Sequence, residues 1–345
     1  MMAYNAKIVL DSVSTAGDRL TTMEVTFPRI VLAEFNTHRV FSRNSASTRA
    51  IPVANQLRKL VADPFVPNQF GKNQTGMQSY EYLEGVKHNE AVDIWLTGRD
   101  RALTTAVELM LGRKLAAQML DYDPLREFVT ADILAEKIDY IARIVKDKID
   151  TFDLVDTSSL LDIHKQHAGR GLETYMWQTV IVTATEWSNF FALRANPQAQ
   201  PEIREVAEWM QRLYQESEPA ELQDGEWHLP YIQPDELHLF AEDPEKMQQV
   251  SAARCARVSY LTHDGKRDLD KDVELYERLA GEGHLSPLEH VATPEYTAYE
   301  LGRTELGDVA QRRITPSPFC GNFRGWKQLR KFVPYESDFS RVEKE

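Results

Sequence analysis

The sequence is poor in cysteine, in long apolar runs and in positive charge, and each shortage excludes a class of protein. Its two cysteines, Cys255 and Cys320, give no disulfide framework and no metal-ligand spacing, which suits a reducing cytoplasm. No apolar run approaches the roughly 20 residues that span a bilayer. The first residues lack the apolar core of a signal peptide. We therefore expect a cytoplasmic protein that does not bind membranes.

Acidic residues outnumber basic ones by 53 to 40, so the formal net charge is −13. A surface of this sign repels nucleic acid, and we expect no nucleic-acid partner. A Gly-rich dinucleotide fingerprint of the GxGxxG kind is also absent. The length allows one large domain or two ordinary ones. We expect a single domain over residues 1–345, with an acidic, turn-rich connector at 218–245.

The densest polar stretch runs from Asn36 to Arg49, with the sequence NTHRVFSRNSASTR. It holds four basic side chains with several hydroxyl and amide groups, and a run of this kind cannot be buried without partners. Guanidinium groups offer phosphate a planar fork of donors, and hydroxyl groups fill the remaining acceptor sites. The stretch therefore favours an anion pocket, and a solvated loop is the alternative interpretation.

Hydrophobic patterning predicts the elements around this stretch. Residues 6–13 and 20–27 read as strands, and the second alternates apolar and polar side chains, which is typical of a half-buried strand. A short helix over about 29–36 then delivers the polar stretch. The pattern at 80–150 is helical. The apolar and aromatic run at 175–193 predicts a buried helix, whose polar exceptions, including Thr183, must face partners or a ligand.

A second basic group lies between Asp162 and Glu173. His164 and His167 are three residues apart, so they share one face if this segment is helical. A metal site needs a further ligand, and no other His or Cys lies at a suitable spacing. We expect no metal here, and Arg170 makes an anion site the better interpretation.

The spacing within the first polar stretch resembles the signature of the flavin-dependent thymidylate synthases. That signature is Arg-His-Arg, a gap of seven residues, a Ser, and an Arg two residues later. Here seven residues separate Arg39 from Ser47, and Arg49 follows. Thr37 replaces the first Arg of the signature, and Ser45 replaces the Glu usually found two residues before the Ser.

Residues 189–203 (NFFALRANPQAQPEI) resemble a second segment of that family, Asn-Phe-Leu-x-Leu-Arg followed by Ala-Gln-x-Glu-Ile. Gln198 replaces the family's His. A third resemblance is out of order. Residues 250–260 are similar to the family's Ala-Arg-x-Ser-Tyr strand, and residues 283–290 to its Ser-Pro-x-Glu-His turn. Both usually precede the signature, so the chain resembles a circularly permuted member. Residues 119–158 resemble an insertion.

The resemblance implies an α/β (α+β) fold, in which a mixed β-sheet packs with a long helical layer. It implies methylation of carbon 5 of a pyrimidine deoxynucleotide monophosphate, dUMP to dTMP. The one-carbon unit would come from methylenetetrahydrofolate and the hydride from FAD that NADPH has reduced. It also implies a homotetramer with sites shared between subunits.

The resemblance also implies roles for individual residues. Arg194 is expected at the pyrimidine ring, as the catalytic cation. The expected substrate-binding residues are Ser47, Arg49, Arg170 and Glu34. The expected cofactor-binding residues are His38, Arg39, Ser45, Asn189, Thr183 and His290.

Three other interpretations remain open. Because Glu34, Thr37, Ser45 and Gln198 depart from the family pattern, the same fold could act on dCMP or form a hydroxymethylpyrimidine. The protein could be a flavin- or nucleotide-binding homologue without catalysis. A cysteine-dependent thymidylate synthase would need an activated thiolate, for which Cys320 is the candidate, although its flanking residues do not match. The basic segment 321–331 could supply the Arg that Thr37 does not.

Overall fold

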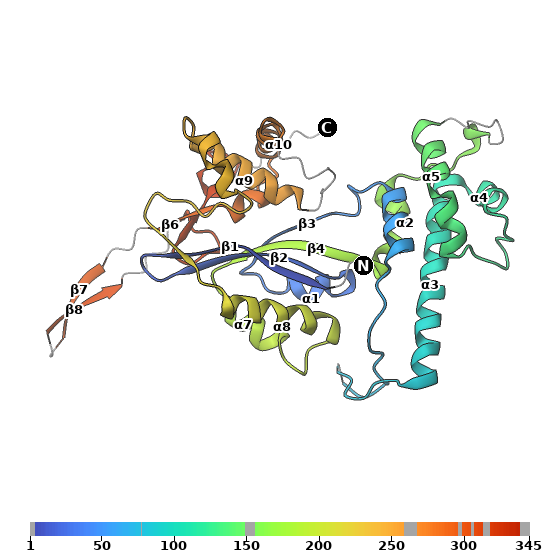
Figure 1. The fold of residues 1–345 in the computed structure, drawn as a ribbon, viewed down its shortest axis with the longest axis horizontal. Helices are drawn as coiled ribbons and strands as arrows, with labels where there is room; N and C mark the ends of the chain where they lie inside the picture. Colours follow the sequence, from blue (N-terminus) through green and yellow to red (C-terminus); the bar gives the residue numbers. More distant parts are fainter. Residues whose placement is uncertain are drawn as a thin grey trace.

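The computed structural model describes residues 4–76, 78–148, 156–258, 268–295, 299–304, 307–312 and 318–338. A five-stranded sheet with the order β3-β4-β2-β1-β5 lies at its centre, with helices on both faces (Figure 1). Its strands are β1 (Asn5–Ser14), β2 (Arg19–Pro28), β3 (Ser42–Ser45), β4 (Trp177–Ala184) and β5 (Ala220–Leu222). Only β5 runs parallel to its neighbour, so the sheet is mixed. The predicted fold class is confirmed.

The strands β1 and β2 form an antiparallel hairpin where the sequence predicted two strands. The turn between them contains Gly17 at a φ of +85°, a conformation that a residue without a Cβ adopts at little cost. The hairpin leads into η1 (Arg29–Val31) and α1 (Leu32–Asn36), which confirm the predicted short helix. The polar stretch begins directly after it.

One face of the sheet is apolar and lies against α1, α7 (Ser188–Arg194) and α8 (Pro201–Glu216) (Figure 1). Met23 and Val25 of β2 pack there with Val182 of β4 and Phe190 of α7. Phe190 also contacts the ring of Phe35 edge-on, at a centroid distance of 5.6 Å. This layer holds the start of the polar stretch against the sheet.

The opposite face of β2 carries Thr22, Glu24 and Thr26, and it is covered as well. Its cover consists of η4 (Pro234–Phe240), α9 (Glu245–Arg257), α10 (Leu269–Gly281) and η5 (Ser286–His290). The prediction of a half-buried strand is therefore wrong. The alternation is real, but the polar side chains meet hydrogen-bond partners from the C-terminal half of the chain.

A layer of helices lies beside one end of the sheet (Figure 1). It comprises α2 (Val53–Ala62), α3 (Gly85–Leu111), α4 (Arg113–Leu120), α5 (Ala131–Asp147), η2 (Thr157–Ser159), α6 (Lys165–Ala168) and η3 (Arg170–Tyr175). The predicted helical region at 80–150 is confirmed where it is described. Helix α5 lies within 119–158 and buries Leu134 and Ile141 in the layer's core. That this range is an insertion stays a prediction.

Two predicted elements are wrong. The run at 175–193 is not one helix but strand β4 followed by α7. A strand buried on both faces reads as a continuous apolar run, and β-branched side chains such as those at 179–183 favour it. The expected strand at 250–260 is the helix α9 up to Arg257, and Ser259 and Tyr260 lie outside the described residues. Cys255 is thus buried in a helix, not in a strand.

The C-terminal part returns to the sheet after a hairpin. Strands β6 (Ala292–Pro294) and β9 (Trp326–Gln328) pair with each other, and η6 (Leu329–Phe332) follows. Between them, β7 (Tyr299–Thr304) and β8 (Gly307–Arg312) form a two-stranded hairpin that projects from the body (Figure 1). The expected connector at 218–245 contains β5 and η4, so it contributes to the packed structure rather than only linking segments.

Arg254 of α9 ties three elements together from a nearly buried position. Its guanidinium pairs with Glu236 of η4 at 2.7 Å and with Asp272 of α10 at 3.0 Å, and it donates to the carbonyl of Tyr231 at 2.9 Å. Removing the cation leaves two buried carboxylates without it. We expect Arg254→Met to lower the free energy of unfolding by about 3 kcal/mol or more, measured by urea denaturation.

Arg58 offers the matched control, because its ion pair with Asp139 at 2.6 Å is largely exposed. Arg58→Met should change the free energy of unfolding by less than about 1 kcal/mol. Equal losses in the two variants would show that the Arg254 cluster does not hold these elements together.

Candidate active site

Arg194, at the C-terminal end of α7, is held by the residues that precede β3. Its Nε donates to Nε2 of His38 at 3.1 Å, and its Nη2 contacts the hydroxyl of Thr37 at 3.1 Å. His38 is buried, with 7% of its surface exposed. Burial, and then the cations Arg194 and Arg43, lower the pKa of His38 to about 4. His38 is therefore neutral at pH 7 and accepts from the guanidinium.

Thr37 stands where the signature has an arginine, and it positions Arg194 instead of adding a charge. Its hydroxyl donates to the carbonyl of Glu34 at 2.6 Å, which leaves its oxygen lone pairs for Arg194. The carboxylate atom Oε2 of Glu34 is buried and has no hydrogen-bond partner within the described structure. These residues therefore combine a fixed cation with an open acceptor.

The second predicted group, Ser47 and Arg49, is joined to Arg170 through Thr48, which lies between the two, and Glu173. Glu173 of η3 accepts from the hydroxyl of Thr48 at 2.5 Å and from Arg170 at 2.7 Å. Arg29 adds a contact to Glu173 at 3.2 Å. Burial raises the pKa of Glu173, but the hydrogen bond from Thr48 and the charge of Arg29 outweigh it and hold that pKa below its usual range.

Six of the predicted site residues are exposed: Arg39, Ser45, Ser47, Arg49, Arg170 and Asn189. Across the part of the chain that the structure describes, neither exposed arginine of the signature makes an ion pair. Their guanidinium groups are available to an anion. The short strand β3 links the Arg49 end to the end where Arg39 and Arg194 lie, and four residues of strand span roughly 10 Å.

A third group lies under β3, on the polar face of the sheet. Thr183 of β4 is opposite Ser42, and its hydroxyl is 2.7 Å from Nδ1 of His290 in η5. The same hydroxyl is 2.7 Å from that of Thr22, which is 2.8 Å from Nε2 of His228. Burial lowers the pKa of both histidines to about 3, so both are neutral. Thr183 is thus on a strand and inside the protein, not on a helix as predicted.

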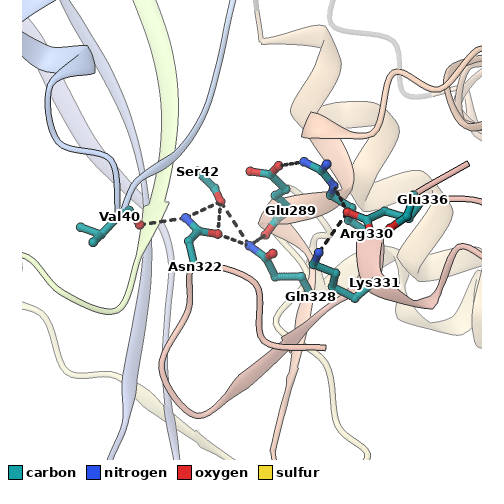
Figure 2. Close-up of polar contacts among 9 residues, drawn as sticks. Val40, Ser42, Glu289, Asn322, Gln328, Arg330, Lys331 and Glu336 are labelled. Atoms are coloured by element: carbon teal, nitrogen blue, oxygen red, sulfur yellow. Dashed lines mark hydrogen bonds and ion pairs between the residues drawn. The ribbon is translucent and has the colours of Figure 1, made fainter. Parts of the chain in front are cut away.

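The C-terminal segment clamps the strand that links these groups (Figure 2). Asn322 donates to the carbonyl of Val40 at 2.9 Å and to Ser42 Oγ at 3.1 Å. Gln328 donates to Asn322 at 2.8 Å and to Ser42 at 3.2 Å. The clamp fixes β3, which forms the edge of the sheet.

The basic residues of this segment are engaged away from Thr37. Arg330 pairs with Glu289 and, at 3.0 Å, with Glu336 (Figure 2). Arg324 lies 3.6 Å from Asp18. The expectation that this segment supplies the arginine missing at position 37 finds no contact in its favour within the described residues.

The residues present fit a heterocyclic ligand. Buried polar atoms without partners among the described residues include Glu34 Oε2, Asn44 Nδ2 and His290 Nε2, an acceptor and two nitrogen atoms. Buried polar atoms in native proteins are normally paired, so open ones call for a ligand or water. A flavin or a pyrimidine offers both donors and acceptors at its edges. No group of His, Cys, Asp or Glu in the described part of the chain is arranged to hold a metal ion.

Several residues of these groups were not expected from the sequence. Thr48 lies within the signature stretch, but nothing in its spacing singles it out. His228 lies in the expected connector, and its contact with Thr22 joins residues more than 200 positions apart. The only local signal was the alternation of Thr and Glu on β2, which marks a polar face but not its partners.

A clamped strand with a fixed guanidinium before it, and after it Arg49, which makes no ion pair within the described residues, suits an anionic ligand. The family model for "Thymidylate synthase complementing protein" (Thy1) matches residues 18–220. The chain belongs to this family, and hence to a family of nucleotide-methylating enzymes. The match includes the polar stretch and residues 189–203. It does not reach 250–260 or 283–290, so the permutation stays a prediction.

Solved structures also match. One is a UMP/dUMP methylase, PolB, from Streptomyces cacaoi, determined with bound 5-Br UMP. It is 17% identical, the match covers 62% of this chain and 89% of that one, and the TM-score is 0.38. A search of curated proteins gave no match. In the described residues, the structure contains no helix suited in length and apolarity to crossing a membrane.

The buried histidines predict how stability depends on pH. Because the folded pKa of His228 and of His290 is near 3 and the unfolded value about 6.5, their contribution is complete above pH 6.5 and is lost as the pH falls toward 3. At pH 5, protonation of each histidine in the unfolded chain should lower the free energy of unfolding by about 2 kcal/mol relative to pH 7. Urea denaturation between pH 5 and 7 measures this loss.

His228→Gln supplies the internal check, because an amide does not titrate. We expect the slope of unfolding free energy against pH to fall by about one proton between pH 5 and 6. An unchanged slope would mean that His228 is protonated in the folded protein.

Proposed function

We propose that the protein methylates carbon 5 of dUMP to give dTMP, using methylenetetrahydrofolate, FAD and NADPH. The observation that carries the proposal is the Arg194 guanidinium held by neutral His38. A cation fixed before the reaction costs no reorganisation when negative charge develops on the pyrimidine ring. Family membership supports the reaction class. The substrate and the cofactors are our inference.

His38 fixes the direction of Arg194 as well as its position. Since Nε2 accepts from Arg194, the imidazole proton resides on Nδ1. A protonated His38 would repel Arg194 and break this contact. The low pKa of His38, about 4, therefore keeps the cation in place at neutral pH.

The other end of β3 would hold the phosphate. Arg49 and Ser47 are exposed there, and Arg170 reaches the same turn through Glu173. Arg170 already has one carboxylate partner, so it can contribute a second fork of donors without losing its anchor. The spacing of about 10 Å along β3 suits a nucleotide that lies along the strand.

FAD, when bound, would supply hydride to the one-carbon unit after reduction by NADPH. The residues that would hold it are His38, Arg39, Ser45, Asn189, Thr183 and His290. The first three belong to the polar stretch, Asn189 lies on α7, and the last two lie on the polar face of the sheet. Thr183 would act through His290, because its own hydroxyl is already bonded to Thr22 and to His290.

A homotetramer with shared sites is part of the proposal. Its support is that so many site residues of one chain are exposed, including both free arginines of the signature. A second subunit lying against β3 would complete the cover. Light scattering that found a monomer would remove this part of the proposal.

The first experiment is an absorbance spectrum of the purified protein, followed in one cuvette by NADPH, methylenetetrahydrofolate and either dUMP or dCMP. We expect a flavin spectrum, bleaching by NADPH, and recovery with dUMP. Recovery only with dCMP would move the substrate to cytosine, and mass analysis of the product would detect a hydroxymethyl group. Bleaching without carbon transfer would favour a homologue without catalysis.

Arg194→Gln tests the proposed catalytic cation. Glutamine still donates a hydrogen bond but carries no charge, so we expect kcat to fall about 100-fold or more while the flavin spectrum persists. Arg212→Gln, an exposed substitution on α8, is the matched control and should leave kcat within twofold. Similar rates in both variants would contradict the role of Arg194.

Cys320→Ala separates this proposal from cysteine-dependent catalysis. Cys320 is buried and donates its thiol to Glu295 at 2.8 Å. We expect turnover within about threefold of wild type, with a small loss of stability from the lost contact. Loss of all turnover with FAD still bound would favour a thiolate nucleophile.

A further inference from the structure

A continuous chain of hydrogen bonds crosses the polar face of the sheet. It runs from Ser12 Oγ to His228 Nδ1 (2.8 Å), and from His228 Nε2 to Thr22 (2.8 Å). It continues from Thr22 to Thr183 (2.7 Å) and from Thr183 to His290 Nδ1 (2.7 Å). All five side chains are at most 1% exposed. The chain ends at His290 Nε2, which has no partner among the described residues.

The two histidine tautomers are coupled by this geometry. Each threonine hydroxyl has one proton, so it donates to one neighbour in the chain and accepts from the other. If His228 carries its proton on Nε2, the direction passes through both threonines and places the proton of His290 on Nε2. If His228 carries it on Nδ1, His290 does too. Mixed arrangements lose a bond.

The number of protons favours one direction once a ligand is bound. Five neutral groups have five donor protons but form only four bonds, so one donor is left at an end of the chain. In one direction the spare donor is His290 Nε2–H. In the other it is the hydroxyl of Ser12, which has His228 as its one partner within the described residues. An acceptor supplied at His290 therefore satisfies all five protons, and nothing supplied there satisfies Ser12.

We propose that His228 and Thr22 are positioning residues, which set His290 as a hydrogen-bond donor through Nε2 toward a carbonyl oxygen or ring nitrogen of the bound heterocycle. This rests on the proposed function for the identity of the ligand, flavin or pyrimidine. Asn44 supports it independently, since its Nδ2 is a second buried donor without a partner. Asn44 lies two positions along β3 from Ser42, which is opposite Thr183, so it faces the same side of the sheet.

Neutral histidines are required for this arrangement, because a doubly protonated ring would reverse one bond of the chain. The low pKa of both rings satisfies that requirement. Neither histidine then acts as a general acid through a charged form. His228 has no route to a ligand except through Thr22 and Thr183.

The first test uses ¹⁵N-histidine NMR on the full protein, with His228→Gln and His290→Gln variants to assign the signals. Without ligand, His228 and His290 should carry their protons on the same-named nitrogen. With FAD and dUMP added, both should be on Nε2. Opposite tautomers in the free protein would overturn the coupling, and this result does not depend on any activity. Nδ1–H on His290 in the complex would overturn the donor role.

The second test cuts the chain in its middle. Thr22→Val should give a mixture of His290 tautomers and lower kcat about tenfold, with KM for dUMP within twofold. Thr22→Ser should restore both, because it keeps the hydroxyl. Thr26→Val is the matched control, since Thr26 and Thr179 make an equivalent cross-strand bond of 2.8 Å that touches no histidine.

The outcomes are distinct from failure of the proposed function. If the wild-type protein binds no FAD and has no turnover, the proposed function fails, while the tautomers of the free protein still test the chain. If Thr22→Val keeps the wild-type tautomer, or if Thr26→Val lowers kcat equally, the positioning role is wrong. Thermal denaturation of each variant establishes that it is folded when measured.

Discussion

Burial of the polar face of β2 and β4 is the constraint on which the rest of the structure depends. Threonine hydroxyls on this face cannot be left dry and unpaired without a cost of about 1–3 kcal/mol each. They obtain partners from His228 and His290, which come from segments far along the chain. The C-terminal part must therefore dock on the sheet in one register. The clamp at Ser42 and the cluster around Arg254 reinforce that docking.

The candidate site depends on this docking for its order. Strand β3 is a four-residue edge strand, and such an edge is weakly held by itself. Asn322 and Gln328 hold it through Ser42, and Thr183 of the neighbouring strand β4 is opposite Ser42. Arg194 is fixed from the opposite, apolar layer by His38. Side chains from two separate layers thus meet at one strand, which explains why the site needs both halves of the chain.

Low histidine pKa values keep the imidazole rings neutral both beside Arg194 and on the polar face of the sheet. His38 is neutral because it is buried beside Arg194 and Arg43. His228 and His290 are neutral because burial penalises their charged forms. The contact with Arg194 defines the tautomer of His38, and the hydrogen bonds through Thr22 and Thr183 couple the tautomers of His228 and His290. Neutral imidazole rings therefore hold both the Arg194 guanidinium and the buried threonine hydroxyls.

Local patterns in the sequence were sufficient for part of this. The hairpin β1–β2, the short helix before the polar stretch and the helical region at 80–150 follow from periodicity and turn residues. The mixed α/β class and the family followed from the spacing of Arg39, Ser47 and Arg49 and from the segment around Arg194. The spacing of such residues is a reliable signal because it shows which side chains follow one secondary-structure element in the same local segment.

Two of the wrong predictions, those for strands β4 and β2, arose because both strands are buried on both faces. The strand β4 was predicted as a helix because a strand covered on two faces loses its alternation. Helix α9 was predicted as a strand through its likeness to a family segment. The polar face of β2 reads as solvent-facing until its partners are known. The sequence by itself determined the family and the fold class, and it named candidate side chains for the chemistry. Only the tertiary structure decided which of them are neutral, which are free, and that His228 reaches His290, because those properties depend on contacts between residues hundreds of positions apart.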